Sequence, residues 1–306
     1  MTKIVFMGTS DFAVSILISI YKFGYDVVAI YTKNIGISKD IIYTVSEDLK
    51  ITLFSPDKFL TKEVIEFIYH KADIGIVVSY GFLLLSSLLS IFPLGCFNIH
   101  ASLLPNLRGA APIQRGIEGG NLKSGITIIS MDKSLDTGFI LLNKELILFS
   151  TIESIELYNL LSFEGSLLIL ELIRQVKSNI LSLIVQDNYK LSYANKLCKF
   201  EGNIIWLKSA KKIENCVRSF IIWPGSFFLF NNLKFKIIRC YIIVNTKSFN
   251  LMKIRKPGQI ISIYPFIVTC GEDYLLIDNI QRMGKTSMDM DSFLNGFSIS
   301  VGNILS

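Results

Sequence analysis

Cysteine is scarce in this sequence of 306 residues, and no two cysteines form a CxxC pair. Such scattered cysteines exclude a zinc ribbon and a disulfide framework, and favour reduced thiols in a cytoplasmic protein that binds no metal. The N-terminus also lacks the apolar core of a secretory signal. The five cysteines are Cys96, Cys198, Cys216, Cys240 and Cys270.

Long apolar runs are rare as well, and only residues 74–95 approach the length of a membrane-spanning helix. This run begins with β-branched residues, is interrupted at Ser79-Tyr80-Gly81 and contains Pro93. It therefore favours a buried strand followed by a buried helix, and no membrane partner is expected. With 51% hydrophobic and 18% charged residues the chain can fill ordinary cores, and its length suggests two domains.

Acidic residues are few in the second half of the chain. Residues 190–306 contain 16 Lys and Arg against 7 Asp and Glu, a net charge of +9. Residues 1–189 contain 15 against 18, a net charge of −3. A general enrichment in lysine would not remove acids from one half only. The asymmetry favours a polyanionic partner that contacts mainly the second half.

Apolar strands alternate with helices at the start of the chain, and this alternation predicts a doubly wound, mostly parallel Rossmann-like sheet in residues 1–188. In such a sheet the site lies outside the carboxyl ends of the strands. The expected strands are 3–8, 26–32, 51–56, 73–79, 95–100, 124–132 and 138–148. The expected helices are 13–24, 40–50, 61–71, 82–90 and 153–178.

The pattern changes in the last third of the chain. Residues 189–208 have the character of a linker, and residues 209–220 of a helix. Short β-patterned runs follow at a spacing typical of small antiparallel barrels and sandwiches. We therefore expect residues 209–306 to form a smaller OB-like β-barrel, a fold often used for single-stranded nucleic acid.

A polar pair stands at the end of the expected strand 95–100. Side chains two apart on a strand share a face, so Asn98 and His100 project together while Ile99 packs on the other side. His70, the only other histidine, ends an amphipathic helix, which leaves His100 as the imidazole available for acid–base chemistry. The turn MGTSDF after the first strand has one glycine and does not match a dinucleotide fingerprint.

Asp136 lies in the short loop MDKSLDTG between two later strands, where an aspartate can also be a simple turn former. Asp132 in the same loop is a weaker candidate for a functional carboxylate. In combination, NIHASLLPNLRGAAPIQR (98–115) and GITIISMDKSLDTG (125–138) resemble the tetrahydrofolate-dependent formyltransferases. The likeness extends along nearly the whole chain, through IVFMGTSDFA, SYANKL and RSFIIWPGSF. Within this family, the motif RGAAPIQR and these segments resemble the branch that formylates charged initiator tRNA.

The resemblance implies a monomeric enzyme that moves the formyl group of 10-formyltetrahydrofolate, its cosubstrate, to the α-amine of methionine on initiator tRNA. The residues that match the catalytic set are Asn98, His100 and Asp136. The residues that match the family's folate-binding turn are Ser102, Leu103, Leu104 and Pro105. The segment expected beside the pteridine contains Tyr80, Gly81 and Phe82. The expected tRNA contacts are Lys33, Lys39, Arg108, Lys211, Lys212 and Arg218.

The proposed chemistry agrees with these residue types. An amine that attacks a formyl carbon creates an oxyanion, for which an amide and an imidazole on one strand face are suitable donors. Asp136 would orient His100, favour its charged form and help to remove the amine proton, directly or through water.

One segment departs from the family pattern. Residues 33–46 contain only two lysines and no arginine or proline, where the family usually has a longer, strongly basic loop. This difference predicts weaker discrimination between initiator and other tRNAs. Three alternatives remain open: formyl transfer to a nucleotide-linked amino sugar, hydrolysis of formyltetrahydrofolate, and tRNA binding without catalysis.

Overall fold

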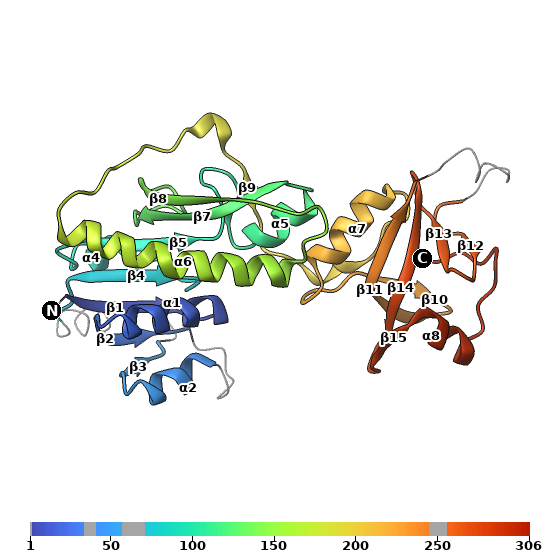
Figure 1. The fold of residues 1–306 in the computed structure, drawn as a ribbon, viewed down its shortest axis with the longest axis horizontal. Helices are drawn as coiled ribbons and strands as arrows, with labels where there is room; N and C mark the ends of the chain where they lie inside the picture. The colour runs from blue at the N-terminus through green and yellow to red at the C-terminus, as the bar shows by residue number, and fades with distance from the viewer. Residues whose placement is uncertain (1, 34–40, 57–70, 245–255) are drawn as a thin grey trace. The chain divides into compact units, whose positions relative to one another are not determined.

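The computed structural model describes residues 2–33, 41–56, 71–244 and 256–306. The chain separates into two compact units (Figure 1). The first unit comprises Met1–Pro112, Lys123–Ile147 and Leu157–Asn195, and the second comprises Ile113–Leu122, Leu148–Glu156 and Lys196–Ser306. The expected helix 61–71, apart from its last residue, and Lys39 lie outside the described residues.

A seven-stranded sheet forms the centre of the first unit. Its strands are β1 Lys3–Gly8, β2 Asp26–Tyr31, β3 Leu53–Phe54, β4 Ile74–Val78, β5 Cys96–His100, β7 Lys123–Ser130 and β8 Ile140–Ile147. They follow the order β3-β2-β1-β4-β5-β7-β8. The pairs from β3 to β5 are parallel, whereas β7 is antiparallel to both β5 and β8. The expected mostly parallel sheet is confirmed.

Helices cover both faces of this sheet. They are α1 Asp11–Lys22, α2 Ile41–Asp48, α4 Ser86–Leu89 and α6 Ser154–Lys177. On one face α1 and α6 are neighbours, because the backbone N–H of Phe12 donates to the hydroxyl of Tyr158. A Cβ atom on Gly165 of α6 would come within 2.6 Å of Ile126 of β7, so this glycine permits close packing on the sheet. On the other face Leu88 of α4 joins a core cluster with Cys96 of β5.

A separate antiparallel sheet forms the second unit. Its strands are β10 Phe227–Phe230, β11 Leu233–Ile243, β12 Ile260–Ser262, β13 Ile267–Thr269, β14 Tyr274–Arg282 and β15 Ser287–Asp289. They pair in the order β10-β11-β14-β13-β12, and β15 pairs with β14. The helices are α5 Pro112–Glu118, α7 Ala210–Ser219 and α8 Met290–Gly296. Phe228, Phe235 and Ile213 lie in the core between the sheet and α7.

Two segments that the sequence analysis assigned to the first domain, 113–122 and 148–156, pack with the second unit. The guanidinium of Arg115 in α5 pairs with Glu201, 86 residues later in the chain. Arg218 in α7 donates to the carbonyl of Ile152. These long-range contacts cannot be read from local periodicity. Within the described ranges, no helix has both the length and the apolar character needed to cross a bilayer.

Candidate active site

The carboxyl end of β5 carries the polar pair expected from the sequence. Ile99 faces α6, where a Cβ on Gly165 would lie 3.6 Å from its side chain. Cys96 belongs to the core cluster on the opposite face of the sheet. Because side chains alternate along a strand, Asn98 and His100 project to the same side as Cys96. They lie at the carboxyl ends of the parallel strands, where doubly wound sheets bind their ligands.

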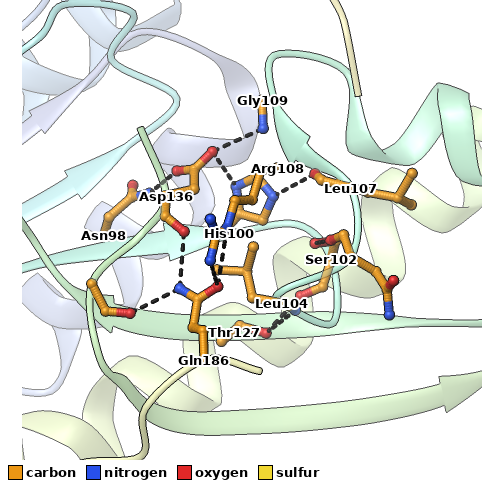
Figure 2. Close-up of polar contacts among 12 residues, drawn as sticks. Asn98, His100, Ser102, Leu104, Leu107, Arg108, Gly109, Thr127, Asp136 and Gln186 are labelled. Atoms are coloured by element: carbon orange, nitrogen blue, oxygen red, sulfur yellow. Dashed lines mark hydrogen bonds and ion pairs between the residues drawn. The ribbon is translucent and has the colours of Figure 1, made fainter. Parts of the chain in front are cut away.

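Asp136, from the loop between β7 and β8, meets both residues (Figure 2). The amide nitrogen Nδ2 of Asn98 donates to Oδ1 of Asp136 at 3.2 Å. Nδ1 of His100 lies 3.5 Å from Oδ2 of the same carboxylate. The backbone N–H of Gly109 donates to Oδ2 as well, at 2.9 Å. The carboxylate thus connects the end of β5 and the segment at Gly109 with a loop that follows them by 27 residues or more.

The surroundings of His100 indicate which form of the ring is present. Its Nε2 lies 2.9 Å from the carbonyl oxygen of Leu107, which can only accept, so Nε2 carries a hydrogen. Its Nδ1 faces the carboxylate of Asp136. The buried ring thus lies between the Leu107 carbonyl and the Asp136 carboxylate.

Two residues beside the cluster have a left-handed backbone conformation. Asp136 has φ +55° and Leu107 has φ +60°, which is uncommon for a residue other than glycine, although aspartate adopts it more readily than most. Gly138, two residues after Asp136, has no room for a side chain, because a Cβ there would lie 1.7 Å from the carbonyl oxygen of Ser130. Packing against β7 therefore requires a glycine at the third position of this Asp-Thr-Gly sequence.

Gln186 is a buried residue that the sequence analysis did not single out. Its amide nitrogen donates to the carbonyl oxygens of Asp136 at 2.9 Å and of Gly138 at 2.8 Å (Figure 2). Its amide oxygen accepts two hydrogen bonds from the guanidinium of Arg108, at 3.1 and 2.6 Å. Gln186 therefore holds the Asp136 loop against the segment that carries Gly109. No sequence signal marks it, since it stands alone in an irregular connection.

The same segment is held in place by a short parallel pairing of β6 Arg108–Gly109 with β9 Tyr193–Ala194. Gly109 has φ +122°, and a Cβ there would lie 2.7 Å from the carbonyl oxygen of Ala194. The glycine of the RGAAPIQR motif thus allows a close backbone approach.

The expected folate turn, 102–105, is anchored to β7. The hydroxyl of Thr127 donates to the carbonyl oxygen of Ser102 at 2.7 Å and accepts from the N–H of Leu104 at 3.1 Å. The hydroxyl of Ser102 donates to the carbonyl of Asn106. The bond between Leu104 and Pro105 is cis. Leu103, between them, lies against β7, because a Cβ on Gly125 would come within 2.5 Å of its side chain.

The second expected folate segment follows β4. Tyr80 is buried in the core cluster, and Phe82 packs edge-on against it with ring centroids 5.4 Å apart. Gly81 is exposed and has φ +76°. The ammonium of Lys33, expected to contact tRNA, lies 4.9 Å from the centre of the Phe82 ring. Lys33 therefore contacts the segment expected beside the pteridine.

The other expected tRNA contacts differ in their surroundings. Arg108 is only 5% exposed and is bonded to Gln186, so its burial argues against a surface role. The guanidinium of Arg218 likewise bonds within the protein, to Glu214, Asn215 and the carbonyl of Ile152. Lys211 pairs with Glu214 at 3.2 Å, and Lys212 is exposed. The sequence predicted tRNA contacts for both arginines, because their neighbours in space could not be seen in it.

The described part of the chain contains no group of three or more His, Cys, Asp and Glu side chains placed to hold a metal ion. A mostly parallel sheet with helices on both faces resembles solved formyltransferase structures, and a separate antiparallel sheet accompanies it here. The formyl transferase family model matches residues 2–173, and the model of the family's C-terminal domain matches residues 196–298. The chain belongs to the formyl transferase family, which confirms the resemblance inferred from the sequence.

The chain is similar over its full length to methionyl-tRNA formyltransferases. It is 33% identical to that of Lachnospira eligens, with 99% of each chain covered. It is 35% identical to that of Alkaliphilus metalliredigens, with 99% of this chain and 98% of the other covered. Among solved structures, the N-formyltransferase from Helicobacter canadensis in complex with folinic acid and dTDP-3-aminofucose shares the fold. Its TM-score is 0.68 at 21% identity, over 92% of this chain and all of that chain.

Proposed function

We propose that this chain transfers the formyl group of 10-formyltetrahydrofolate to the α-amino group of methionyl initiator tRNA, giving formylmethionyl-tRNA for translation initiation. The observation that carries the proposal is the cluster in which the Asp136 carboxylate bonds to Asn98 and lies against the ring of His100. Full-length similarity to methionyl-tRNA formyltransferases supports the choice of acceptor. The net charge of +9 in residues 190–306 supports a nucleic-acid acceptor further.

Asn98 is the donor to the oxyanion that forms when the amine attacks the formyl carbon. One hydrogen of its amide nitrogen is held by Asp136, which fixes the direction of the other. Within the described residues no side chain or backbone group accepts that second hydrogen. A fixed donor of this kind is typically worth about a hundred- to a thousandfold in rate.

His100 and Asp136 handle protons and charge. The bond from the amine nitrogen to the formyl carbon forms, the bond from that carbon to N10 of the folate breaks, and the amine loses a proton while N10 gains one. Asp136 accepts the amine proton through water, since its two oxygens have lone pairs beyond those used by Asn98 and Gly109. The imidazolium of His100 adds positive charge beside the oxyanion and supplies the proton to N10. Its Nε2 is free to do so only when it leaves the Leu107 carbonyl.

The chain divides functionally into a catalytic domain, 1–188, a linker, 189–208, and a tRNA-binding domain, 209–306. We further propose that the second domain is a closed, OB-like barrel. The last residues of the chain support this closure, because they bond to both edge strands of the sheet. Leu305 donates to the carbonyl of Gly258, next to β12, and Ser306 donates to that of Leu229 in β10. A monomeric state and a cytoplasmic location remain predictions.

The decisive experiment is a formylation assay with the purified chain, 10-formyltetrahydrofolate and charged initiator Met-tRNA. We expect formylmethionyl-tRNA to appear only when both substrates are present. A nucleotide-linked amino sugar and a reaction without acceptor serve as comparisons. Formyl transfer to the sugar alone would establish that alternative, and full-rate formate release without any acceptor would establish the hydrolase.

A further inference from the structure

A pocket of about 180 Å³ opens on the sheet of the second unit, within residues that the catalytic proposal does not use. Its wall combines two lysines of β11 with apolar surface from the WPGSF segment and from the end of β14. The residues used in the argument below are Pro224, Gly225, Phe227, Lys234, Lys236 and Met283.

Strand alternation places the charged and aromatic groups of the pocket together. Phe235 of β11 points into the core, so Lys234 and Lys236 point to the opposite face of the sheet. Phe227 of β10 is the direct neighbour of Lys236 in the sheet register. The Lys234 ammonium lies 3.2 Å from the centre of the Phe227 ring, and Lys236 donates to the carbonyl of Ile221 at 2.7 Å. Both ammonium groups are thereby held in place.

The positive charge in the pocket is not balanced. No ion pair in the described part of the chain includes Lys199, Lys234 or Lys236. Burial lowers the pKa of Lys236, and burial together with the charge of Lys199 lowers the pKa of Lys234. A bound anion would relieve both the lost hydration and the mutual repulsion of these ammonium groups.

The wall of the pocket also depends on a glycine. Gly225 has φ +78°, and a Cβ there would lie 2.6 Å from Cε of Lys236. Any larger residue would press on the lysine stem and change the position of its ammonium. Pro224 precedes it, and Met283, which is 65% exposed, provides apolar surface on the other side.

We propose that this pocket binds one nucleotide of the tRNA, with Lys234 and Lys236 on its phosphate and the apolar wall formed by Pro224, Phe227 and Met283 against its sugar or base. Proteins that bind single-stranded nucleic acid combine positive charge along the phosphate backbone with aromatic side chains against the bases. The inference rests on the proposed function, because it deepens the account of how the acceptor tRNA is bound.

The test replaces both ammonium groups and keeps their apolar stems, as Lys234→Met with Lys236→Met. We expect the affinity for initiator tRNA to fall by about tenfold at roughly 0.1 M salt, and the slope of log affinity against log salt to fall by about 1 to 2. The KM for Met-tRNA in the formylation assay should rise while kcat at saturating tRNA stays unchanged. Lys234→Met alone, which leaves the bond from Lys236 to Ile221 intact, serves as a second variant if the double variant unfolds.

The matched control is Lys22→Met with Lys144→Met, which removes the same two charges from exposed positions in the first unit. We expect it to change tRNA affinity by less than about twofold, since it removes no phosphate contact. Equal losses of tRNA affinity in the two double variants would show that only net charge matters, and the proposal for the pocket would then be wrong. If the parent protein formylates Met-tRNA and the pocket variant binds tRNA as tightly as the parent does, the pocket proposal is wrong and the proposed function stands. A parent that neither binds nor formylates Met-tRNA would overturn the proposed function.

Discussion

The polar groups of the two units are arranged in opposite ways. At the end of β5 the buried polar side chains are paired: Asp136 accepts from Asn98 and Gly109, and Gln186 bridges Arg108 and the Asp136 loop. On the sheet of the second unit, Lys234 and Lys236 are half-buried and have no carboxylate partner among the described residues. In the first region the carboxylate and the guanidinium have internal partners, whereas in the second no carboxylate balances the two ammonium groups.

The difference follows from what each region is proposed to do. Formyl transfer needs a donor and a carboxylate fixed to a fraction of an ångström, because small displacements of a catalytic group are costly. Internal partners supply that precision. Binding of a polyanion depends on charge that acts over several ångströms and tolerates displacement. A carboxylate partner would cancel that charge, and neither lysine has one among the described residues.

The largest expected effect is at the catalytic cluster. Asp136→Asn removes the charge that faces His100 and the acceptor for the amine proton, and we expect kcat for formylation to fall by about a thousandfold. tRNA affinity should stay within about threefold of the parent, because the phosphate contacts are elsewhere. Asp132→Asn is the matched control, since Asp132 lies in the same loop and bonds to Thr137 and Ser134 instead. If both variants turn over at similar rates, Asp136 is not the carboxylate of the site.

A smaller effect is expected at Gln186, which we place as a positioning residue. Gln186→Ala should lower kcat by about ten- to a hundredfold with an unchanged KM for tRNA, because the Asp136 loop loses its two anchors. Gln186→Glu still accepts from Arg108, but in its ionised form its second oxygen faces the two carbonyl oxygens and cannot donate to them. It should keep the pairing with Arg108 while kcat stays low.

The control for this position is Gln175→Ala, because the Gln175 side chain bonds to Glu171 in the same helix, α6. We expect it to leave kcat unchanged. Recovery of kcat together with stability in Gln186→Glu would mean that Gln186 matters only for folding around Arg108.

The salt response should separate the two regions directly. We expect affinity for tRNA to fall at least about tenfold between roughly 50 and 200 mM salt, because counterions are released from each neutralised phosphate. Affinity for formyltetrahydrofolate should change by less than about threefold over the same range, since few of its contacts involve phosphate-like charge density. Titrations of both ligands at a series of salt concentrations measure the two slopes. Equal slopes would remove the distinction between the regions.

The smallest effect concerns stability in the second unit. The Glu201 carboxylate accepts from both amino groups of Arg115 and from the N–H of Cys198, and the bond from Arg115 is the main cause that lowers the pKa of Glu201. A carboxyl group whose pKa is lowered by folding stabilises the fold at pH values above its ordinary pKa of 4.5. This contribution disappears as the pH falls through the lowered pKa. Glu201→Gln should therefore cost about 1 kcal/mol at neutral pH, allowing for partial exposure, and progressively less in acid.

Denaturant unfolding at neutral and acidic pH measures this difference. Glu145→Gln is the control, because its ion pair with Lys123 is exposed and should contribute under about 0.5 kcal/mol. A Glu201 variant that is equally destabilised at every pH would exclude the proposed ionic contribution.

Much of the framework could be predicted from local patterns. The strands of the first sheet lie where apolar runs were expected, and the alternation along β5 placed Asn98 and His100 on one side. The helix expected over 82–90 is shorter, at Ser86–Leu89, because the residues before it form an irregular segment around Gly81. The α8 helix was missed, although Asp289 caps it through the N–H of Ser292. Its seven residues are too few to show a clear helical period.

The sequence by itself determined the order of the elements, the polar pair on β5 and the basic character of the second half, because strand alternation, turn residues and charge are local properties. Only the tertiary structure decided that Asp136 reaches Asn98 across 38 residues, that Gln186 holds the Asp136 loop across 50, and that Arg108 is buried. Contacts of this kind depend on how sheet registers and connecting segments bring distant backbone together. No periodicity within one segment carries that information.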